Sequence, residues 1–144
     1  MNRLHVHFRV KDLDASIRFY SALFGRCPDK REPDYAKWML EDPRANIAIS
    51  TRHEGTGVDH VGLQVDSDAE LAVLAARLKD AKAEIVEEAD ATCCYARSNK
   101  FWARSPEGAN WELYHTFGDS RTFGAAPDPF SGLNSAPAAK ACCG

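Results

Sequence analysis

The chain has 144 residues, of which 44% are hydrophobic and 27% charged, and its formal net charge is −3. These values are typical of one globular domain, and the acidic balance does not favour a nucleic-acid surface, which needs clustered positive charge. No apolar run approaches the roughly 18–20 residues that cross a bilayer, and no signal-peptide pattern opens the sequence. We therefore expect a cytoplasmic protein with neither nucleic acid nor membrane as a partner.

The first half of the chain predicts a strand, a helix and two further strands, over residues 4–10, 12–25, 35–40 and 46–50. Asp12 can cap the helix, and Gly25 stands where helices commonly end. Residues 42–45 predict a turn between the last two strands, and the two glycines within residues 52–58 predict a linker.

The second half repeats this order. Residues 59–65 alternate apolar and polar side chains, which predicts a strand with one buried face. Residues 67–70 have capping-box spacing and precede an apolar helical stripe. Short strands are predicted next, over residues 84–88, 93–97, 100–104 and 110–114. We interpret both halves as copies of one βαβββ module, so we predict an α+β fold of two tandem modules, about residues 1–51 and 58–117, within one domain of residues 1–117.

Residues 118–144 are rich in Gly, Pro, Ala and Ser, a composition typical of a flexible tail. This tail carries Cys142 and Cys143, and the other cysteines are Cys27, Cys93 and Cys94. An odd number of cysteines, four of them in adjacent pairs, does not indicate a disulfide framework. Thiols in a reducing compartment are the expected state.

The same short pattern opens both halves: His-Val-His-Phe-Arg-Val begins at His5, and His-Val-Gly-Leu-Gln-Val begins at His60. A duplicated fold would therefore place these two histidines at equivalent positions on two strands. On the last strand, Glu112 alternates with apolar neighbours and would face the same side as the histidines. Two neutral imidazoles and one carboxylate suit Fe(II), and also Mn(II), Co(II) or Ni(II), with about three positions open for substrate and dioxygen.

A single histidine or glutamate on the exposed face of a strand is usually an ordinary polar residue. The repeated position of His5 and His60 is what favours a metal site. His7 lies on the same strand face as His5 and could replace it as a ligand, support a ligand or contact substrate. Tyr114 is a second candidate for a supporting role. We prefer His5 as the ligand because it aligns with His60.

The second chemical feature is the pair Cys93 and Cys94. Two adjacent thiolates can chelate a thiophilic centre, such as trivalent arsenic or cadmium, through two soft sulfur ligands. The alternative is a pair of small buried residues, since free cysteine is often simply part of a core. Adjacent residues on a strand point in opposite directions, so one ligand could use both sulfurs only at a loop or bend.

The doubled βαβββ pattern, with His near the start of each module and Glu on the final strand, resembles the vicinal-oxygen-chelate superfamily over about residues 1–117. That group includes glyoxalase I, extradiol dioxygenases, fosfomycin-resistance proteins and bleomycin-binding proteins. The resemblance implies a half-barrel metal site. Glyoxalase I enzymes generally use a fourth ligand, a Glu on the last strand of the first module. Here the equivalent position is Ala48, which cannot bind metal, and this favours three ligands and argues against glyoxalase chemistry.

Shorter motifs narrow the resemblance: Thr-Cys-Cys-Tyr-Ala over 92–96, Trp-Glu-Leu-Tyr over 111–114, Asp-Ser-Arg-Thr-Phe-Gly over 119–124, and the Cys-Cys pair in the tail. Together they are similar to the arsenic-inducible and cadmium-induced branch, which contains organoarsenical carbon–arsenic lyases. The resemblance implies that nonheme Fe(II) binds oxygen while a vicinal cysteine pair holds a trivalent organoarsenical such as methylarsenite. Oxygen-dependent cleavage would release arsenite and oxidise the carbon fragment.

Carried over to this sequence, the resemblance assigns iron to His5, His60 and Glu112, and arsenic to Cys93 and Cys94. Some members carry Gln where His5 stands. The side chains expected from strand parity to surround the groups on arsenic are Tyr95, Trp102 and Tyr114. The tail cysteines Cys142 and Cys143 could relay arsenic from solvent or form an inactive tail, and Cys27 is expected only to pack.

Two other functions stay open. A non-catalytic module that sequesters arsenite or cadmium would need the Cys93–Cys94 pair but not the histidines. Another enzyme of the superfamily, such as an antibiotic thiol transferase, would need His5, His60 and Glu112 but not the cysteines. A homodimer is also possible, because modules of this superfamily pair within one chain or between two.

Overall fold

The computed structural model describes residues 2–121 and 130. Its elements in chain order are β1 (Arg3–Arg9), α1 (Leu13–Phe24), β2 (Lys30–Glu32), β3 (Tyr35–Glu41), β4 (Arg44–Ser50), β5 (Gly57–Gln64), α2 (Asp68–Asp80), β6 (Glu84–Cys93), β7 (Ala96–Arg104) and β8 (Asn110–Asp119). The order βαβββ occurs twice, which confirms the predicted α+β class with two tandem modules. The tail cysteines Cys142 and Cys143 lie outside the described residues.

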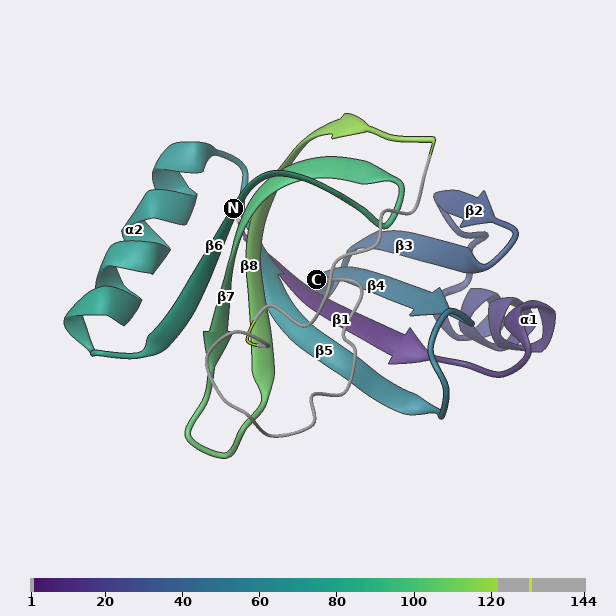
Figure 1. Cartoon of the computed structure of the whole chain (residues 1–144). Coiled ribbons are helices and arrows are strands. Elements are labelled where there is room, and N and C mark those ends of the chain that lie inside the picture. The colour runs from purple at the N-terminus through teal and green to yellow at the C-terminus, as the bar shows by residue number, and fades with distance from the viewer. Residues whose placement is uncertain (1, 122–129, 131–144) are drawn as a thin grey trace.

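All the strands form one open, mixed sheet of eight strands in the order β2-β3-β4-β1-β5-β8-β7-β6. The two modules meet where β1 pairs antiparallel with β5, and each of these strands has a parallel neighbour from its own module, β4 or β8. The sheet is curved, and the two helices lie toward its opposite ends (Figure 1). The first strand of each module therefore lies at the middle of the sheet, next to the first strand of the other.

Each helix packs against the strands of its own module, and a separate apolar core lies beneath each helix. The core under α1 includes Leu13, Ile17 and the fully buried Trp38. The core under α2 includes Leu71, Ala75, Leu113 and partly buried Trp111. Because side chains alternate across a strand, packing Trp111 and Leu113 toward α2 turns residue 112 to the opposite face of the sheet.

The helix ends follow the sequence signals. The Asp12 carboxylate accepts a hydrogen bond from the backbone N–H of Ala15 at 2.9 Å, and Gly25 adopts the left-handed conformation with φ of 66° that ends α1. The Ser67 hydroxyl accepts from the N–H of Glu70 at 3.2 Å at the start of α2. These contacts confirm the predicted start and end of α1 and the predicted start of α2.

The region around the cysteine pair differs from the sequence expectation. One continuous strand, β6, runs to Cys93, so the predicted strand over 93–97 is wrong. Cys94 and Tyr95 instead form the two-residue turn between β6 and β7, with φ angles of 52° and 60°. Such turns usually carry Asn or Gly, which tolerate positive φ, and neither residue type signals the turn here. The short strand β2 was also not predicted, and β8 continues past Tyr114 to Asp119.

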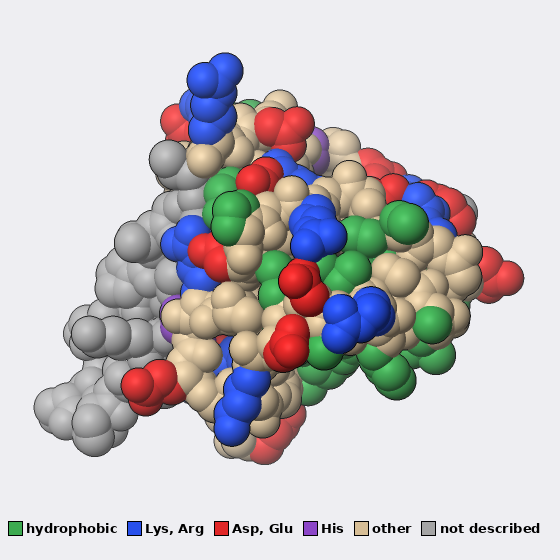
Figure 2. Space-filling model, turned by 90° about the vertical axis from the view of Figure 1, so that its right-hand side faces the viewer, with side chains coloured by type: hydrophobic (Ala, Val, Ile, Leu, Met, Phe, Trp, Pro, Cys, Tyr) green, Lys and Arg blue, Asp and Glu red, His purple; other side chains and the backbone are tan. Residues whose placement is uncertain are grey.

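Among the described residues, no helix combines the length and apolar character needed to cross a membrane. On the face of the molecule seen in Figure 2, acidic and basic side chains of the described residues are interspersed with hydrophobic ones. This mixed surface agrees with the modest net charge of −3.

Candidate functional site

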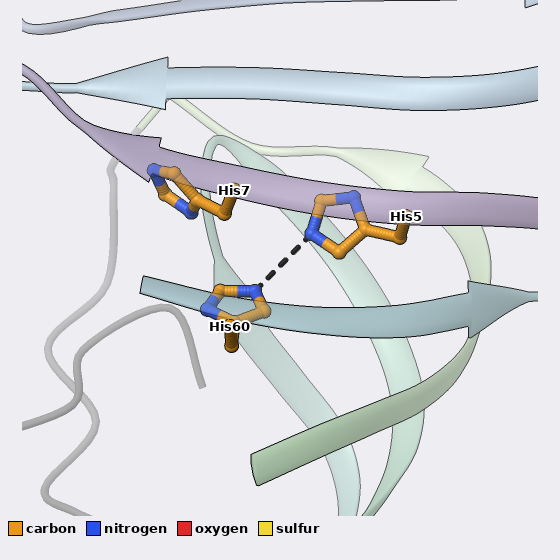
Figure 3. Close-up of side chains that lie close together, drawn as sticks. All are labelled: His5, His7 and His60. Atoms are coloured by element: carbon orange, nitrogen blue, oxygen red, sulfur yellow. Dashed lines mark hydrogen bonds between the residues drawn. The ribbon is translucent and has the colours of Figure 1, made fainter. Parts of the chain in front are cut away.

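Three histidines meet on the face of the sheet opposite the helices. β1 carries His5 and His7, and β5 carries His60 directly opposite His7 in the antiparallel register. All three side chains are buried. The Nε2 atoms of His5 and His60 lie 3.1 Å apart, the contact drawn as a dashed line in Figure 3. The predicted pairing of these two histidines across the module junction is therefore present in the fold.

Glu112 joins this group from β8, which runs parallel to β5. Its Oε2 atom lies 3.3 Å from Nε2 of His60 and 3.6 Å from Nε2 of His5. Gly62 is paired with Glu112 in the register, and a Cβ atom at this glycine would lie 2.1 Å from the Glu112 carbonyl oxygen. Glycine at position 62 therefore allows β8 to approach closely enough to bring the carboxylate to the imidazoles.

The imidazoles of His5 and His60 are each fixed by a hydrogen bond at Nδ1, the ring nitrogen that does not face the other histidine. Nδ1 of His5 lies 3.1 Å from the carbonyl oxygen of Asn46, and Nδ1 of His60 lies 2.8 Å from Oδ2 of Asp59. Each acceptor favours a proton on Nδ1, which leaves the Nε2 lone pair available to a cation. Hydrogen bonds of this kind orient the histidine ligands of metal sites in proteins.

His7 is arranged differently. Its Nε2 lies 2.9 Å from the hydroxyl oxygen of Ser50, and its Nδ1 has no hydrogen-bond partner among the described residues. The three histidines nevertheless each offer a nitrogen within 4.8 Å of the others. A buried nitrogen without a partner beside convergent imidazoles fits a metal-binding donor set, and it keeps His7 as an alternative to His5.

The electrostatics of His5, His7 and Glu112 favour their metal-binding protonation states. Burial and the neighbouring His60 lower the pKa of His5 to about 4, and burial holds the pKa of His7 well below its usual value. Burial opposes ionisation of Glu112, but the Lys100 ammonium and the two imidazoles outweigh it and hold the carboxyl pKa below its usual range. Neutral imidazoles and an ionised carboxylate are the forms that bind divalent cations.

The predicted cysteine pair lines the same pocket as two of the metal-binding candidates, His5 and Glu112. The Sγ atoms of Cys93 and Cys94 are 3.2 Å apart, because the turn bends the chain between them. One cavity of about 30 Å³ is lined by both cysteines and by His5 and Glu112. A volume of roughly 10–15 Å³ already accommodates a water molecule, so the cavity has room for an ion or a very small molecule.

The turn that carries the cysteines is fastened to the first module. The Tyr95 hydroxyl donates to Oδ1 of Asp34 at 2.7 Å, and Nη2 of Arg52 donates to the same hydroxyl at 3.3 Å. The ammonium of Lys30 donates to the Tyr95 carbonyl oxygen at 2.6 Å. The turn comes from the second module, and these contacts hold it over the face of the first.

The remaining residues singled out in the sequence lie as follows. The Trp102 ring packs 5.4 Å from that of His60, and the Tyr114 ring lies 5.3 Å from that of His5. Tyr95 forms the turn described above. Ala48 is buried opposite His7 and brings no donor atom, as expected. Cys27 is exposed, which does not agree with the packing role expected for it.

Sequence reasoning missed two charged residues of the site. Asp59 stands directly before His60, and its adjacency was the only available signal. Lys100 has its ammonium 2.8 Å from Oε1 of Glu112 and is almost completely buried. Strand parity could have grouped it with Trp102, two residues along β7, but a lysine on a strand is normally expected to face solvent.

Comparison with known proteins gives a consistent result. The model of the Glyoxalase/Bleomycin resistance protein/Dioxygenase superfamily matches residues 3–113. The "Trivalent organoarsenical cleaving enzyme" of Thermomonospora curvata is 39% identical over 130 residues, which cover 89% of this chain and 86% of that protein. The "Cadmium-induced protein CadI" of Mycobacterium bovis is 38% identical over 129 residues, covering 88% and 84%. The Mn(II)-bound glyoxalase of Novosphingobium aromaticivorans shares the fold, with a TM-score of 0.60 and 19% identity over 92% of this chain and 45% of that chain.

Proposed function

Because the chain belongs to the glyoxalase/bleomycin resistance protein/dioxygenase superfamily, we propose that it is an Fe(II)-dependent enzyme that uses dioxygen to cleave the carbon–arsenic bond of trivalent organoarsenicals such as methylarsenite. The observation that carries this proposal is the shared cavity, whose wall contains two of the metal-binding candidates, His5 and Glu112, and the two adjacent cysteines. The name of the similar protein from Thermomonospora curvata supports the choice of substrate class.

His5, His60 and Glu112 would hold the metal, with His7 as the alternative to His5. The hydrogen bonds that the imidazoles donate to the Asn46 carbonyl and the Asp59 carboxylate fix both rings before any metal arrives, which lowers the cost of assembling the site. Fe(II) is the proposed cofactor, and Mn(II), Co(II) or Ni(II) suit the same donors. Bound iron would supply the activation of dioxygen, which no side chain can perform.

Cys93 and Cys94 would hold the arsenic. Each thiol replaces one hydroxyl on arsenic, so that an As–S bond forms, an As–O bond breaks and the hydroxyl leaves with the thiol proton as water. Two such bonds fix the remaining As–C bond beside the metal site, and this positioning contributes to the rate of cleavage. Contrary to the thiol state expected from the sequence, Cys94 is disulfide-bonded in the structure, and its partner is not Cys93, whose Sγ lies 3.2 Å away. Arsenic binding therefore requires reduction of Cys94. A reducing compartment such as the cytoplasm would keep both thiols available.

We further propose that residues 1–117 form the catalytic domain, with modules of about 1–51 and 58–117, and that residues 118–144 are an appended tail. Cys142 and Cys143 would then relay arsenic from solvent. One chain supplies all of the proposed ligands, so a homodimer is compatible with this proposal but is not needed to complete the site.

A sequestering protein is the second candidate, and the similarity to a protein named for induction by cadmium favours it. Such a protein would bind arsenic or cadmium through the Cys93–Cys94 pair and would leave the carbon–arsenic bond intact. An antibiotic thiol transferase is a third possibility that would need the metal site alone.

The test is to reduce the protein, load it anaerobically with Fe(II), add methylarsenite and then admit air, with separation of the arsenic species in the products. We expect arsenite to appear only when protein, iron and air are all present. His60→Ala should release no arsenite yet still bind methylarsenite. Cys94→Ser should neither bind methylarsenite nor release arsenite.

Tight binding of intact methylarsenite by the wild type would instead support the sequestering function. A protein that neither binds nor cleaves methylarsenite, but still binds iron, would remove the arsenic proposal altogether.

A further inference from the structure

Lys100 is the one lysine among the described residues whose ammonium forms an ion pair with Glu112. It lies on β7 opposite Tyr114, and its side chain points to the same face as that of Trp102. The side chains of Lys100 and Glu112 are exposed by only 2% and 6%. The ammonium also lies 5.9 Å from the centre of the Trp102 ring, close enough for a cation–π contact.

The two oxygens of Glu112 have different neighbours. Oε1 accepts from Nζ of Lys100 at 2.8 Å, whereas Oε2 lies 3.3 Å and 3.6 Å from the facing nitrogens of His60 and His5. A carboxylate without a partner on Oε1 could rotate about its last torsion, which is broad, or could offer both oxygens to one cation. The pair with Lys100 therefore selects a single oxygen for the site.

Lys100 also lines the cavity that the two halves of the proposed active site share. Its side chain lines this cavity together with Cys93 and Cys94. A buried lysine at this place gives Oε1 of Glu112 a partner and leaves Oε2 facing the imidazoles.

We propose that Lys100 is a positioning residue for the metal site, which holds Oε1 of Glu112 so that only Oε2 is presented to a divalent cation beside His5 and His60. This inference rests on the proposed function for its relevance to catalysis, but it concerns metal binding and can be tested without an arsenical. Lys100 itself does not bind the metal.

A purely structural role is the competing explanation. In that case Lys100 neutralises Glu112 so that the buried carboxylate does not destabilise the fold, and it has no effect on the metal. Loss of the lysine would then lower thermal stability, while the affinity for metal would be unchanged or would rise, because one positive charge near the cation has been removed.

The experiment measures the dissociation constant of Mn(II), from the EPR signal of free Mn(II), and the visible absorption of bound Co(II), which reports the coordination. Lys100→Met is compared with wild type, with Lys100→Arg and with the control Lys79→Met. Lys79 is a matched control because its ammonium lies 5.9 Å from the ring of Phe101, the next residue of β7, which faces the core under α2. Lys100→Gln replaces Lys100→Met if the latter shows no cooperative thermal unfolding.

We expect Lys100→Met to bind Mn(II) about 10–100-fold more weakly and to alter the Co(II) spectrum. Lys100→Arg should recover most of the affinity, and Lys79→Met should match wild type. Unchanged or tighter Mn(II) binding in Lys100→Met, with an unchanged Co(II) spectrum, would overturn the proposal. If wild type binds Mn(II) but the iron-loaded protein releases no arsenite, the proposed function fails and the role of Lys100 is still decided by these affinities.

Discussion

Asp59 and His60 are neighbours in the sequence, and their side chains form one of the shortest polar contacts of the site, 2.8 Å between Oδ2 and Nδ1. Adjacent residues on a strand usually point to opposite faces, but the β1–β5 register shifts at this point: His7 pairs with His60 and Phe8 with Val58, which leaves Asp59 as an extra residue. The Asp59 carboxylate is also 3.5 Å from Nε of Arg9. Asp59 is therefore fixed from two sides and can hold the imidazole in one orientation.

Replacing Asp59 with Asn should weaken Mn(II) binding about 10–100-fold, because a neutral amide holds the imidazole less firmly than a carboxylate and favours a proton on Nδ1 less strongly. The chain offers a matched control in Asp68, whose Oδ1 lies 3.0 Å from Nδ1 of His115 away from the site. Asp68→Asn should bind Mn(II) like wild type. Equal losses in the two variants would show that the effect is general rather than local.

The pH dependence of metal binding should follow His60. Burial disfavours its imidazolium, but the hydrogen bonds with Asp59 and Glu112 outweigh this and raise the pKa of His60 above the usual value. Because the pKa of His5 is lowered to about 4 and that of His60 is raised, His60 is the histidine ligand that keeps its proton up to the higher pH. Metal must displace that proton, so affinity is reduced below the pKa of His60 and restored as pH rises through it.

Mn(II) titrations between about pH 5.5 and 8.5 would measure this dependence. We expect the logarithm of the affinity to rise by about one for each pH unit below the pKa of His60 and then to level off. An affinity that does not change over this range would contradict the assignment of His60 as a protonated ligand.

At the scale of single elements, the turn between β6 and β7 decides whether the two sulfurs can act on one ligand. The contacts of Tyr95 with Asp34 and Arg52 hold that turn against the first module. A hydrogen bond of this kind contributes about 0.5–1.5 kcal/mol. Tyr95→Phe should therefore raise the KM for methylarsenite about 2–10-fold, while the affinity for Mn(II) stays the same.

Tyr20 provides the control, because it packs against Trp38 in the core under α1. Tyr20→Phe should leave the KM unchanged. A loss of Mn(II) affinity in Tyr95→Phe, or a KM equal to that of wild type, would show that the turn is not held by this hydroxyl in the way described.

The elements also show what sequence reasoning can and cannot reach. Alternation along residues 60–65 and 110–114 was enough to predict which strand faces carry His60 and Glu112, because side chains in a strand alternate regardless of the rest of the fold. The turn at Cys94 and Tyr95 was not predictable, because its positive φ angles are stabilised by contacts with residues more than forty positions away. Lys100 was missed for the same reason, since its burial depends on the distant partner Glu112.

At the scale of the whole molecule, the proposed ligands come from both modules. His5 belongs to the first module, and His60 and Glu112 belong to the second. A metal bound by all three would therefore link the modules across the β1–β5 junction. Because it binds the folded chain and not the unfolded one, it should raise the free energy of unfolding.

At a free Mn(II) concentration of 100 times the dissociation constant, this gain is about 2.7 kcal/mol, which corresponds to a rise in Tm of roughly 5–15 °C for a domain of this size. Thermal unfolding with and without Mn(II) measures it. His60→Ala should show little or no rise. A rise of the same size in His60→Ala would place the metal elsewhere on the chain.

The measurement that tests the central proposal most directly is a single-turnover experiment with methylarsenite on Fe(II)-loaded, reduced protein, comparing wild type with Glu112→Gln. In both proteins the thiols are intact, so both should bind one equivalent of methylarsenite before air is admitted. After air, we expect wild type to convert that equivalent to arsenite, while Glu112→Gln retains intact methylarsenite at its thiols. Arsenite release at equal rates from both proteins, or from neither, would contradict the proposal that a metal held by Glu112 cleaves an arsenical held by the cysteine pair.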